Sequence, residues 1–200
     1  ERLAFWKQRL NNVLGPNGRI ITDTVPEFVH IIGEQPLLPE LNPEEAQNRF
    51  NLVCRNFVRV FARSEHPLVV FLDDLQWADD ASLSLLYTIA TDRGLENILL
   101  IGAFRDNESA APDPLLLAKD AIIQEGTQVT TLKLEPLPAT RVRQIVANLL
   151  RRDDEACSQL AALVFDKTGG NPFFVNQFLK TLYEQGRLIL DADHGWQWDI

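Results

Sequence analysis

The sequence predicts an α/β fold in which a parallel sheet is followed by a helical region. Two apolar runs, residues 68–72 and 97–103, are typical of strands buried on both faces of a parallel sheet. Residues 81–91 between them have helical periodicity, so the three segments form a strand–helix–strand unit with parallel strands. No buried strand pattern recurs after residue 136, where helical periodicity takes over.

The composition is that of an ordinary globular chain of one or two domains. Of its 200 residues, 46% are hydrophobic and 24% charged, which is enough to bury a core. The net charge of −9 argues against a nucleic-acid groove, because binding phosphates needs a basic field. No apolar run approaches the roughly 18 residues of a membrane span, and the first residues lack a signal-peptide pattern. We therefore expect a cytoplasmic protein without a membrane or nucleic-acid partner, whose isolated cysteines Cys54 and Cys157 are core thiols.

The N-terminal part is predicted to be helical. Residues 2–14 have apolar side chains at helical spacing, and the turn residues 15–18 end the pattern. Residues 19–42 are rich in proline and indicate one short helix with an irregular connection. Asn42 and Pro43 then form a strong helix start, with an N-cap, a proline at the first position and acidic residues in the first turn. We interpret the arginines of this helix as a solvated basic flank rather than as phosphate ligands: Arg49, Arg55, Arg59 and Arg63.

Two carboxylates follow the first predicted strand, and an arginine follows the second. Open α/β sheets bind ligands at the edge where parallel strands end, so Asp73, Asp74 and Arg105 should converge there. Mg²⁺ prefers oxygen ligands and keeps several waters, so one carboxylate and substrate phosphates would satisfy it, while the second carboxylate could orient or deprotonate a water. Two structural alternatives stay open: the acids cap the following turn or helix, and Arg105 pairs with Asp106 or Glu108.

The rest of the α/β part is predicted to contain one more helix and one more strand. The helix covers residues 114–125, and a third apolar strand with Thr and Val covers 128–134. The segment Glu135–Pro138 breaks this pattern, which places a domain boundary near residue 136. The expected domains are residues 1–135, a helical part at 136–186, and the start of a hairpin or winged-helix unit at 187–200.

The helical part is predicted to contain helices over 139–151, 156–168 and 173–185. Between the last two, Gly169 and Gly170 end one helix and Pro172 begins the next. Spacing alone explains this segment as an inter-helix turn.

Three separated motifs resemble, in order, those of one protein family. The run from Val69 to Asp79, which includes Asp-Asp-Leu-Gln-Trp-Ala-Asp, resembles the Walker B segment of the STAND signalling ATPases. These form a branch of the AAA+ class of P-loop ATPases that is found in large bacterial transcription activators and multidomain signalling kinases. Ile101-Gly-Ala-Phe-Arg105 resembles their sensor strand, and Gly170-Asn-Pro172 is similar to the GxP turn of their helical lid. The resemblance implies a three-layer P-loop NTPase fold with a parallel sheet, followed by an α-helical lid and the start of a winged-helix-like hairpin.

The resemblance also implies a role for each matching residue. Asp73 would hold Mg²⁺, Asp74 would position the attacking water, and Arg105 would contact the γ-phosphate of ATP. In the lid, the nucleotide would be contacted by Gly170, Asn171 and Pro172. The chemistry would be phosphoryl transfer, in which the protein positions groups and stabilises charge.

The phosphate-binding loop of this family has no counterpart in the sequence. Such a loop has the form G-x-x-x-x-G-K-[ST], and none of the ten glycines here precedes a lysine. The sequence also contains no methionine. We therefore expect the loop and the first two strands of the sheet to lie upstream. The ATPase would be active with the loop present and inactive without it, because the loop supplies most phosphate contacts.

Two classes of function follow. The first is an ATP-binding and ATP-hydrolysing regulatory switch in a bacterial signal-transduction protein, with ATP and Mg²⁺ as cofactors. Its partners would be kinase or sensor domains of the same polypeptide, together with further copies of itself. The second is a non-catalytic scaffold that keeps the fold and contacts other proteins. Hydrolysis that depends on Asp74 distinguishes the two.

Overall fold

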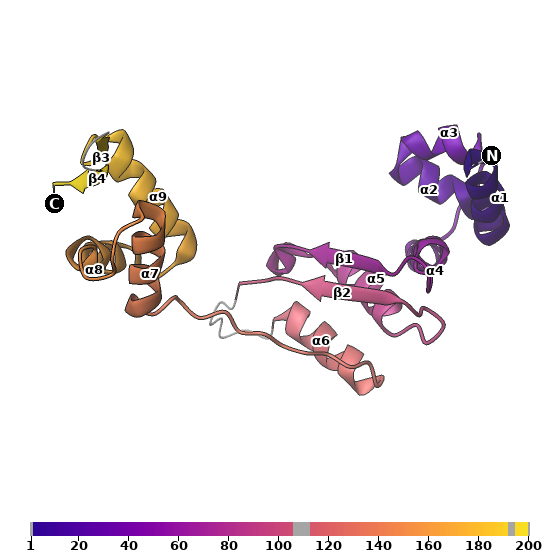
Figure 1. Cartoon of the computed structure of the whole chain (residues 1–200). Coiled ribbons are helices and arrows are strands. Elements are labelled where there is room, and N and C mark those ends of the chain that lie inside the picture. Colours follow the sequence, from indigo (N-terminus) through magenta and orange to yellow (C-terminus); the bar gives the residue numbers. More distant parts are fainter. Residues whose placement is uncertain (1, 106–112, 192–194, 200) are drawn as a thin grey trace. The chain divides into compact units, whose positions relative to one another are not determined.

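The computed structural model describes residues 2–105, 113–191 and 195–199. It is a mixed α/β structure with a small parallel sheet and many helices, as the sequence predicts (Figure 1). The chain divides into two compact units, Glu1–Thr130 and Thr131–Ile200. The domain boundaries drawn from the sequence, after residues 135 and 186, stay predictions.

The first unit begins with a helical cluster. The helix predicted over residues 2–14 is confirmed as α1 (Arg2–Leu14). The region 19–42 holds two short helices instead of one, α2 (Gly18–Thr24) and α3 (Val29–Ile32), because a 3₁₀ turn that begins at Pro26 separates them. A further 3₁₀ turn, Gly15–Asn17, follows α1. These helices share a buried core with α4 (Pro43–Phe61), formed by Leu10, Leu14, Ile21, Ile32, Val53 and Val60.

The start of α4 is the one that the sequence predicts. Asn42 Oδ1 accepts a hydrogen bond from the Glu45 N–H at 2.9 Å, and Pro43 occupies the first helical position. Glu44 and Glu45 lie in the first turn, where the helix dipole favours negative charge. The cap therefore satisfies one of the backbone donors that a helix start leaves free.

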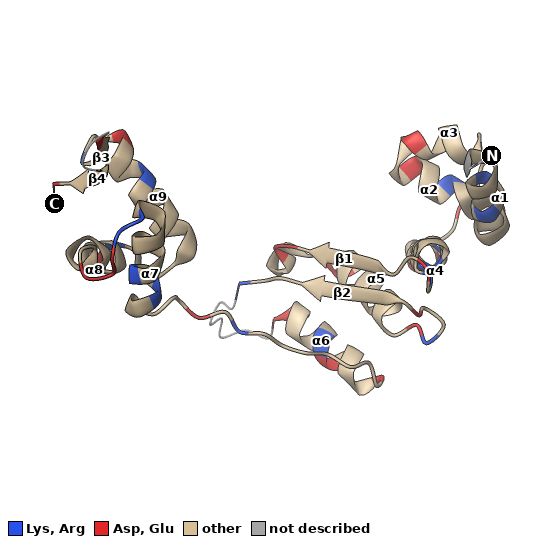
Figure 2. Ribbon diagram, viewed as in Figure 1, with Lys and Arg blue, Asp and Glu red and all other residues tan. Residues whose placement is uncertain are grey.

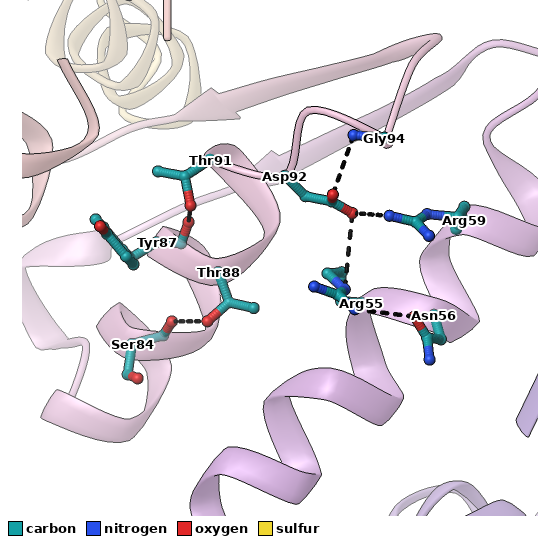
Figure 3. A network of polar contacts seen from close by, with 9 residues as sticks. All are labelled: Arg55, Asn56, Arg59, Ser84, Tyr87, Thr88, Thr91, Asp92 and Gly94. Atoms are coloured by element: carbon teal, nitrogen blue, oxygen red, sulfur yellow. Dashed lines mark hydrogen bonds and ion pairs between the residues drawn. The ribbon is translucent and has the colours of Figure 1, made fainter. Parts of the chain in front are cut away.

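Two arginines of α4 are ion-paired, which corrects the interpretation of a solvated basic flank. Asp92 follows α5 (Asp80–Ala90), accepts a hydrogen bond from Arg59 and lies 3.7 Å from Arg55 Nε (Figure 3). Asp92 Oδ1 also accepts from the Gly94 N–H at 3.1 Å. Spacing along one helix does not reveal this pairing, because the fold brings Asp92 to α4 from another segment.

The sheet of the first unit pairs two parallel strands. β1 (Leu68–Leu72) and β2 (Ile98–Gly102) lie in register, with Leu68 opposite Ile98 and Leu72 opposite Gly102. Because α5 connects them, the predicted strand–helix–strand unit is confirmed. Both strands therefore end at the same edge of the sheet.

The expectation that both faces of these strands are buried is wrong. Burial alternates along each strand, and the side chains of one face are exposed: Val69, Phe71, Leu99 and Ile101. Phe71 is 59% exposed and Leu99 is 55% exposed. An apolar run is compatible with a strand covered on one face or on two, so periodicity alone does not separate these cases.

The third predicted strand, over residues 128–134, does not form. After α6 (Pro114–Gln124), these residues are an extended segment outside any strand pairing (Figure 1). Leu132 is 82% exposed and Leu134 is 92% exposed. A strand needs a partner for its backbone hydrogen bonds, and within the described ranges β2 pairs only with β1. The Thr and Val residues of this segment favour a strand, but their propensity alone does not form one.

The second unit packs helices against a hairpin. It contains α7 (Ala139–Leu150), α8 (Ser158–Thr168), α9 (Pro172–Glu184) and the antiparallel strands β3 (Leu188–Asp191) and β4 (Gly195–Trp198). The three predicted helices and the hairpin are confirmed. Fully buried side chains of this unit include Val142, Val146, Leu160 and Val164.

The two cysteines have the surroundings of core thiols. Cys157 is buried and Cys54 is half-buried, and neither forms a disulfide. Burial raises the pKa of both thiols, which favours the protonated form over the nucleophilic thiolate. Among the helices of the described residues, none combines the length and apolar character needed to cross a membrane.

Candidate functional site

The turn after β1 is hydrogen-bonded to the end of β2. The Ala103 N–H donates to the Leu72 carbonyl at 2.8 Å, and the Leu75 N–H donates to the Ala103 carbonyl at 3.0 Å. These bonds hold the residues that follow the two strands at one edge. Figure 2 shows acidic residues after β1 and a basic residue after β2.

Leu75 also packs over Gly102, the last residue of β2. A Cβ atom at Gly102 would lie 2.6 Å from Leu75 Cδ1, so the Leu75 side chain fills the space beside this glycine and would have to shift for a larger residue. The turn is therefore fixed to the strand by packing as well as by hydrogen bonds.

The two predicted acids have exposed side chains at this edge. Asp73 Oδ1 accepts a hydrogen bond from the Asp74 N–H at 2.9 Å. Asp74 has φ 55° and ψ 37°, a left-handed conformation that Asp and Asn adopt more readily than other residues with a side chain. The chain then continues into a 3₁₀ turn, Leu75–Trp77.

The helix after the turn is capped by Asp79, which excludes Asp73 and Asp74 as the caps of that helix. Asp79 Oδ1 accepts a hydrogen bond from the Ser82 N–H at 2.8 Å at the start of α5. Hydrogen bonds from Ser82 lower the pKa of Asp79. Asp73 does bond to the backbone of the turn through one oxygen, so the alternative of a turn cap holds for that oxygen.

Gln76 bridges the ends of the two strands, a contact that the sequence did not predict. Its Nε2 donates to Asp74 Oδ1 at 2.7 Å, and its Oε1 accepts from the Arg105 N–H at 3.1 Å. Gln76 is half-buried, whereas Asp74 and Arg105 are exposed. Gln76 lies inside the Asp-Asp-Leu-Gln-Trp-Ala-Asp string, but its role depends on how the 3₁₀ turn folds back toward β2.

Arg105 shares the edge with the acids through its backbone. Its guanidinium forms no ion pair with residues 2–105, 113–191 or 195–199. Its alternative partners, Asp106 and Glu108, lie outside the described residues. The Arg105 side chain itself is exposed.

Asp73 offers one donor atom of the kind that Mg²⁺ prefers, and the described residues gather no group of three or more His, Cys, Asp or Glu side chains that could hold a metal by themselves. The second carboxylate oxygen of Asp73 accepts no hydrogen bond from the residues described, and the side chain is exposed. A single free carboxylate oxygen suits Mg²⁺, which keeps several waters and takes its other ligands from phosphates.

The three predicted lid residues lie in the second unit, in the turn between α8 and α9. The Gly170 carbonyl accepts from the Leu137 N–H at 2.9 Å, Asn171 Oδ1 caps α9 by accepting from the Phe173 N–H at 3.0 Å, and Pro172 is the first residue of that helix. Each residue thus has a structural role in the turn. The Asn171 amide nitrogen makes no hydrogen bond to the described residues, so the side chain retains a donor.

Comparisons with known proteins connect this edge to a family. Residues 1–101, which contain β1, the two acids and all but the last residue of β2, match the model of the AAA ATPase domain. The chain is similar to hybrid signal transduction histidine kinase G of Dictyostelium discoideum, with 28% identity over 264 residues that cover 99% of this chain and 8% of that protein. The chain thus spans about 8% of the length of the curated relative that it matches. No solved structure matches the chain. Because the family model covers half of it, the chain belongs to the AAA ATPase domain family.

Proposed function

We propose that the chain is part of an ATP-binding and ATP-hydrolysing regulatory switch in a signal-transduction protein. The observation that carries the proposal is the shared edge of β1 and β2, where hydrogen bonds bring Asp73, Asp74 and the backbone of Arg105 together. The family and the signalling relative support it.

Each residue of the edge has a proposed part in phosphoryl transfer. Asp73 holds Mg²⁺ through its free carboxylate oxygen, and Asp74 orients the attacking water. Arg105 contacts the γ-phosphate, where a guanidinium can form two parallel hydrogen bonds. Gly170, Asn171 and Pro172 stay proposed nucleotide contacts on the strength of their resemblance to the lid turn of this family.

The proposed module is of the STAND type, with its phosphate-binding loop and two further strands upstream. A backbone nest and a lysine from such a loop would supply most contacts to the phosphates. The proposed setting is cytoplasmic, beside kinase or sensor domains of the same polypeptide and with self-association of the module.

Calorimetry on two polypeptides tests nucleotide binding. A polypeptide extended by about a hundred upstream residues should bind Mg-ATP, the length following from typical strand and loop sizes. The 200-residue chain should bind it weakly or not at all. Lack of binding by the extended polypeptide would contradict the proposal.

Asp74→Asn separates an ATPase from a scaffold. In the extended polypeptide, this change should lower turnover about a hundredfold or more, as loss of a catalytic base does, and leave Mg-ATP affinity within about threefold. The control is Asp80→Asn, an exposed residue of the first turn of α5, which should leave turnover unchanged. Steady-state ATPase assays and titration calorimetry measure the two quantities.

The second candidate is a non-catalytic scaffold. It is favoured by the exposed apolar face of the sheet, because large exposed apolar patches often contact other proteins. A scaffold would show no ATP turnover to lose in the unmodified polypeptide, and Asp74→Asn would then have no effect on hydrolysis.

A further inference from the structure

We infer that Gln76 is a positioning residue that orients the Asp74 carboxylate and ties it to the end of β2. The inference rests on the proposed function, because it assigns Gln76 a part in the reaction at the same edge. It extends the site by one residue, which acts through Asp74 and makes no contact with substrate.

The geometry of the bridge carries the inference. The Gln76 amide spans from Asp74 Oδ1, at 2.7 Å, to the Arg105 N–H, at 3.1 Å. Its half-buried position in the 3₁₀ turn restricts its rotamers, whereas Asp74 is exposed. Within the described part of the chain, no other side chain hydrogen-bonds to the Asp74 carboxylate.

The chemistry of an amide matches both of its partners at this position. The Arg105 N–H can only donate, so it faces the amide oxygen. The amide NH₂ then faces the Asp74 carboxylate, which only accepts when it is ionised. A carboxylate in place of the amide would still accept from Arg105 but would repel Asp74. Gln76 is thus matched to both of its neighbours.

The bridge also links the two proposed catalytic residues. Asp74 follows β1, Arg105 follows β2, and one side chain connects the carboxylate of the first with the backbone of the second. The left-handed backbone at Asp74 sets an unusual exit direction for the side chain, which the amide then fixes. Catalytic groups need such support, because small errors in their position greatly reduce rate.

Amide hydrogen exchange measured by NMR on the 200-residue chain tests the bridge itself. Gln76→Ala should raise the exchange rate of the Arg105 amide about tenfold, because its acceptor is lost. Gln76→Glu should leave that amide protected, since an acceptor remains. The Ala103 amide, bonded to the Leu72 carbonyl, should be unchanged in both variants. An Arg105 amide that exchanges equally fast in Gln76→Ala and the unmodified chain would overturn the inference.

Turnover of the extended polypeptide tests positioning. Gln76→Glu should lower kcat about tenfold or more, with the KM for Mg-ATP within about twofold, because the hydrogen bond to a charged group is replaced by repulsion. If Gln76 only connected the turn to the Arg105 N–H, Gln76→Glu would keep that hydrogen bond and kcat would not change. Full kcat in this variant would therefore overturn the inference. The matched control is Gln124→Glu, at an exposed glutamine at the end of α6, which should change neither quantity.

The two experiments distinguish a failure of the proposed function from a failure of the inference about Gln76. If the unmodified polypeptide hydrolyses no ATP, the proposed function and the catalytic part of the inference both fail. The exchange data still decide whether Gln76 bridges the strand ends. If turnover is present but insensitive to Gln76→Glu, only the inference fails.

Discussion

Gly170 shows how one backbone position constrains the second unit. Its φ is +78°, and a Cβ atom there would lie 2.1 Å from the Leu137 carbonyl oxygen. The neighbouring Gly169 has φ +58°, but nothing lies within 4 Å of the Cβ it would carry. The two glycines therefore share a left-handed backbone and differ in the space around them.

Substituting the two glycines one at a time should separate the cost of a left-handed backbone from the cost of a steric clash with Leu137. Gly170→Ala should lower the free energy of unfolding of this unit by about 3 kcal/mol or more, because the backbone of Leu137 must move. Gly169→Ala should cost about 1 kcal/mol, the strain of a left-handed alanine alone. Hydrogen exchange of peptides from α8 and α9, followed by mass spectrometry, measures both. Equal costs would contradict the assigned role of Leu137.

Single residues differ in how far the sequence predicts them. Asp73, Asp74 and Arg105 could be assigned to one edge because each directly follows an apolar strand, and parallel strands end together. Gln76 could not be assigned, because its partners depend on the 3₁₀ turn and on bonds between that turn and Ala103. Local order along the chain thus predicts where a residue lies better than what it contacts.

At the scale of elements, Asp92 joins α4 to the connection between α5 and β2. Its carboxylate bonds to Arg59 and to the Gly94 N–H, with Arg55 nearby (Figure 3). A Cβ atom at Gly94 would lie 2.9 Å from Arg59 Nη2, so the end of the Arg59 side chain lies directly against this turn. Burial of Asp92 opposes its charge, but the Gly94 N–H and Arg59 outweigh it and lower the pKa of the carboxyl.

Asp92→Asn should destabilise the first unit by about 1–2 kcal/mol, because hydrogen bonds to a charged group are lost from a partly exposed pair. Since folding lowers the pKa, the stabilisation is complete above the ordinary value of about 3.9 and is lost as pH falls through the folded value. Urea unfolding from pH 7 to pH 3 measures this, and the difference between the two proteins should shrink toward acid pH. Asp120→Asn, an exposed residue of α6, is the control and should behave as the unmodified chain. A constant difference across this range would contradict the assigned ion pairs.

Elements that carry their own end signals were predictable, and the element that needs a distant partner was not. The start of α4 follows from Asn42 and Pro43, whose cap is local. The segment 128–134 has the residue types of a strand. A strand also needs a neighbouring strand whose edge is unpaired and can accept its backbone hydrogen bonds. The same reason explains the exposed face of β1 and β2, because covering it depends on other elements.

At the scale of the whole molecule, the two compact units have separate cores. Leu10 is 1% exposed in the core of the first unit, and Leu160 is fully buried in that of the second. Among the residues that the structure describes, the core clusters of the two units share no member. The units therefore have independent sources of stability.

Leu160→Ala should lower the stability of the second unit by about 2–5 kcal/mol, because it removes buried methyl groups and leaves a cavity. The protection of amides in α1 and α4 should remain unchanged. Leu10→Ala should produce the reverse pattern, with loss of protection in α1 and α4 only. Native-state hydrogen exchange resolves the two units, and a loss of protection in both from either change would show that they unfold as one.

The uncovered face of the β1–β2 sheet has a consequence for the chain in a cell. Val69, Phe71, Leu99 and Ile101 give an open apolar surface on strands whose outer edges are unpaired in the described part of the chain. Such surfaces favour aggregation unless another element covers them or charges interrupt them. We therefore expect the 200-residue chain to aggregate when it is produced as an isolated polypeptide, unless another segment or protein covers this face.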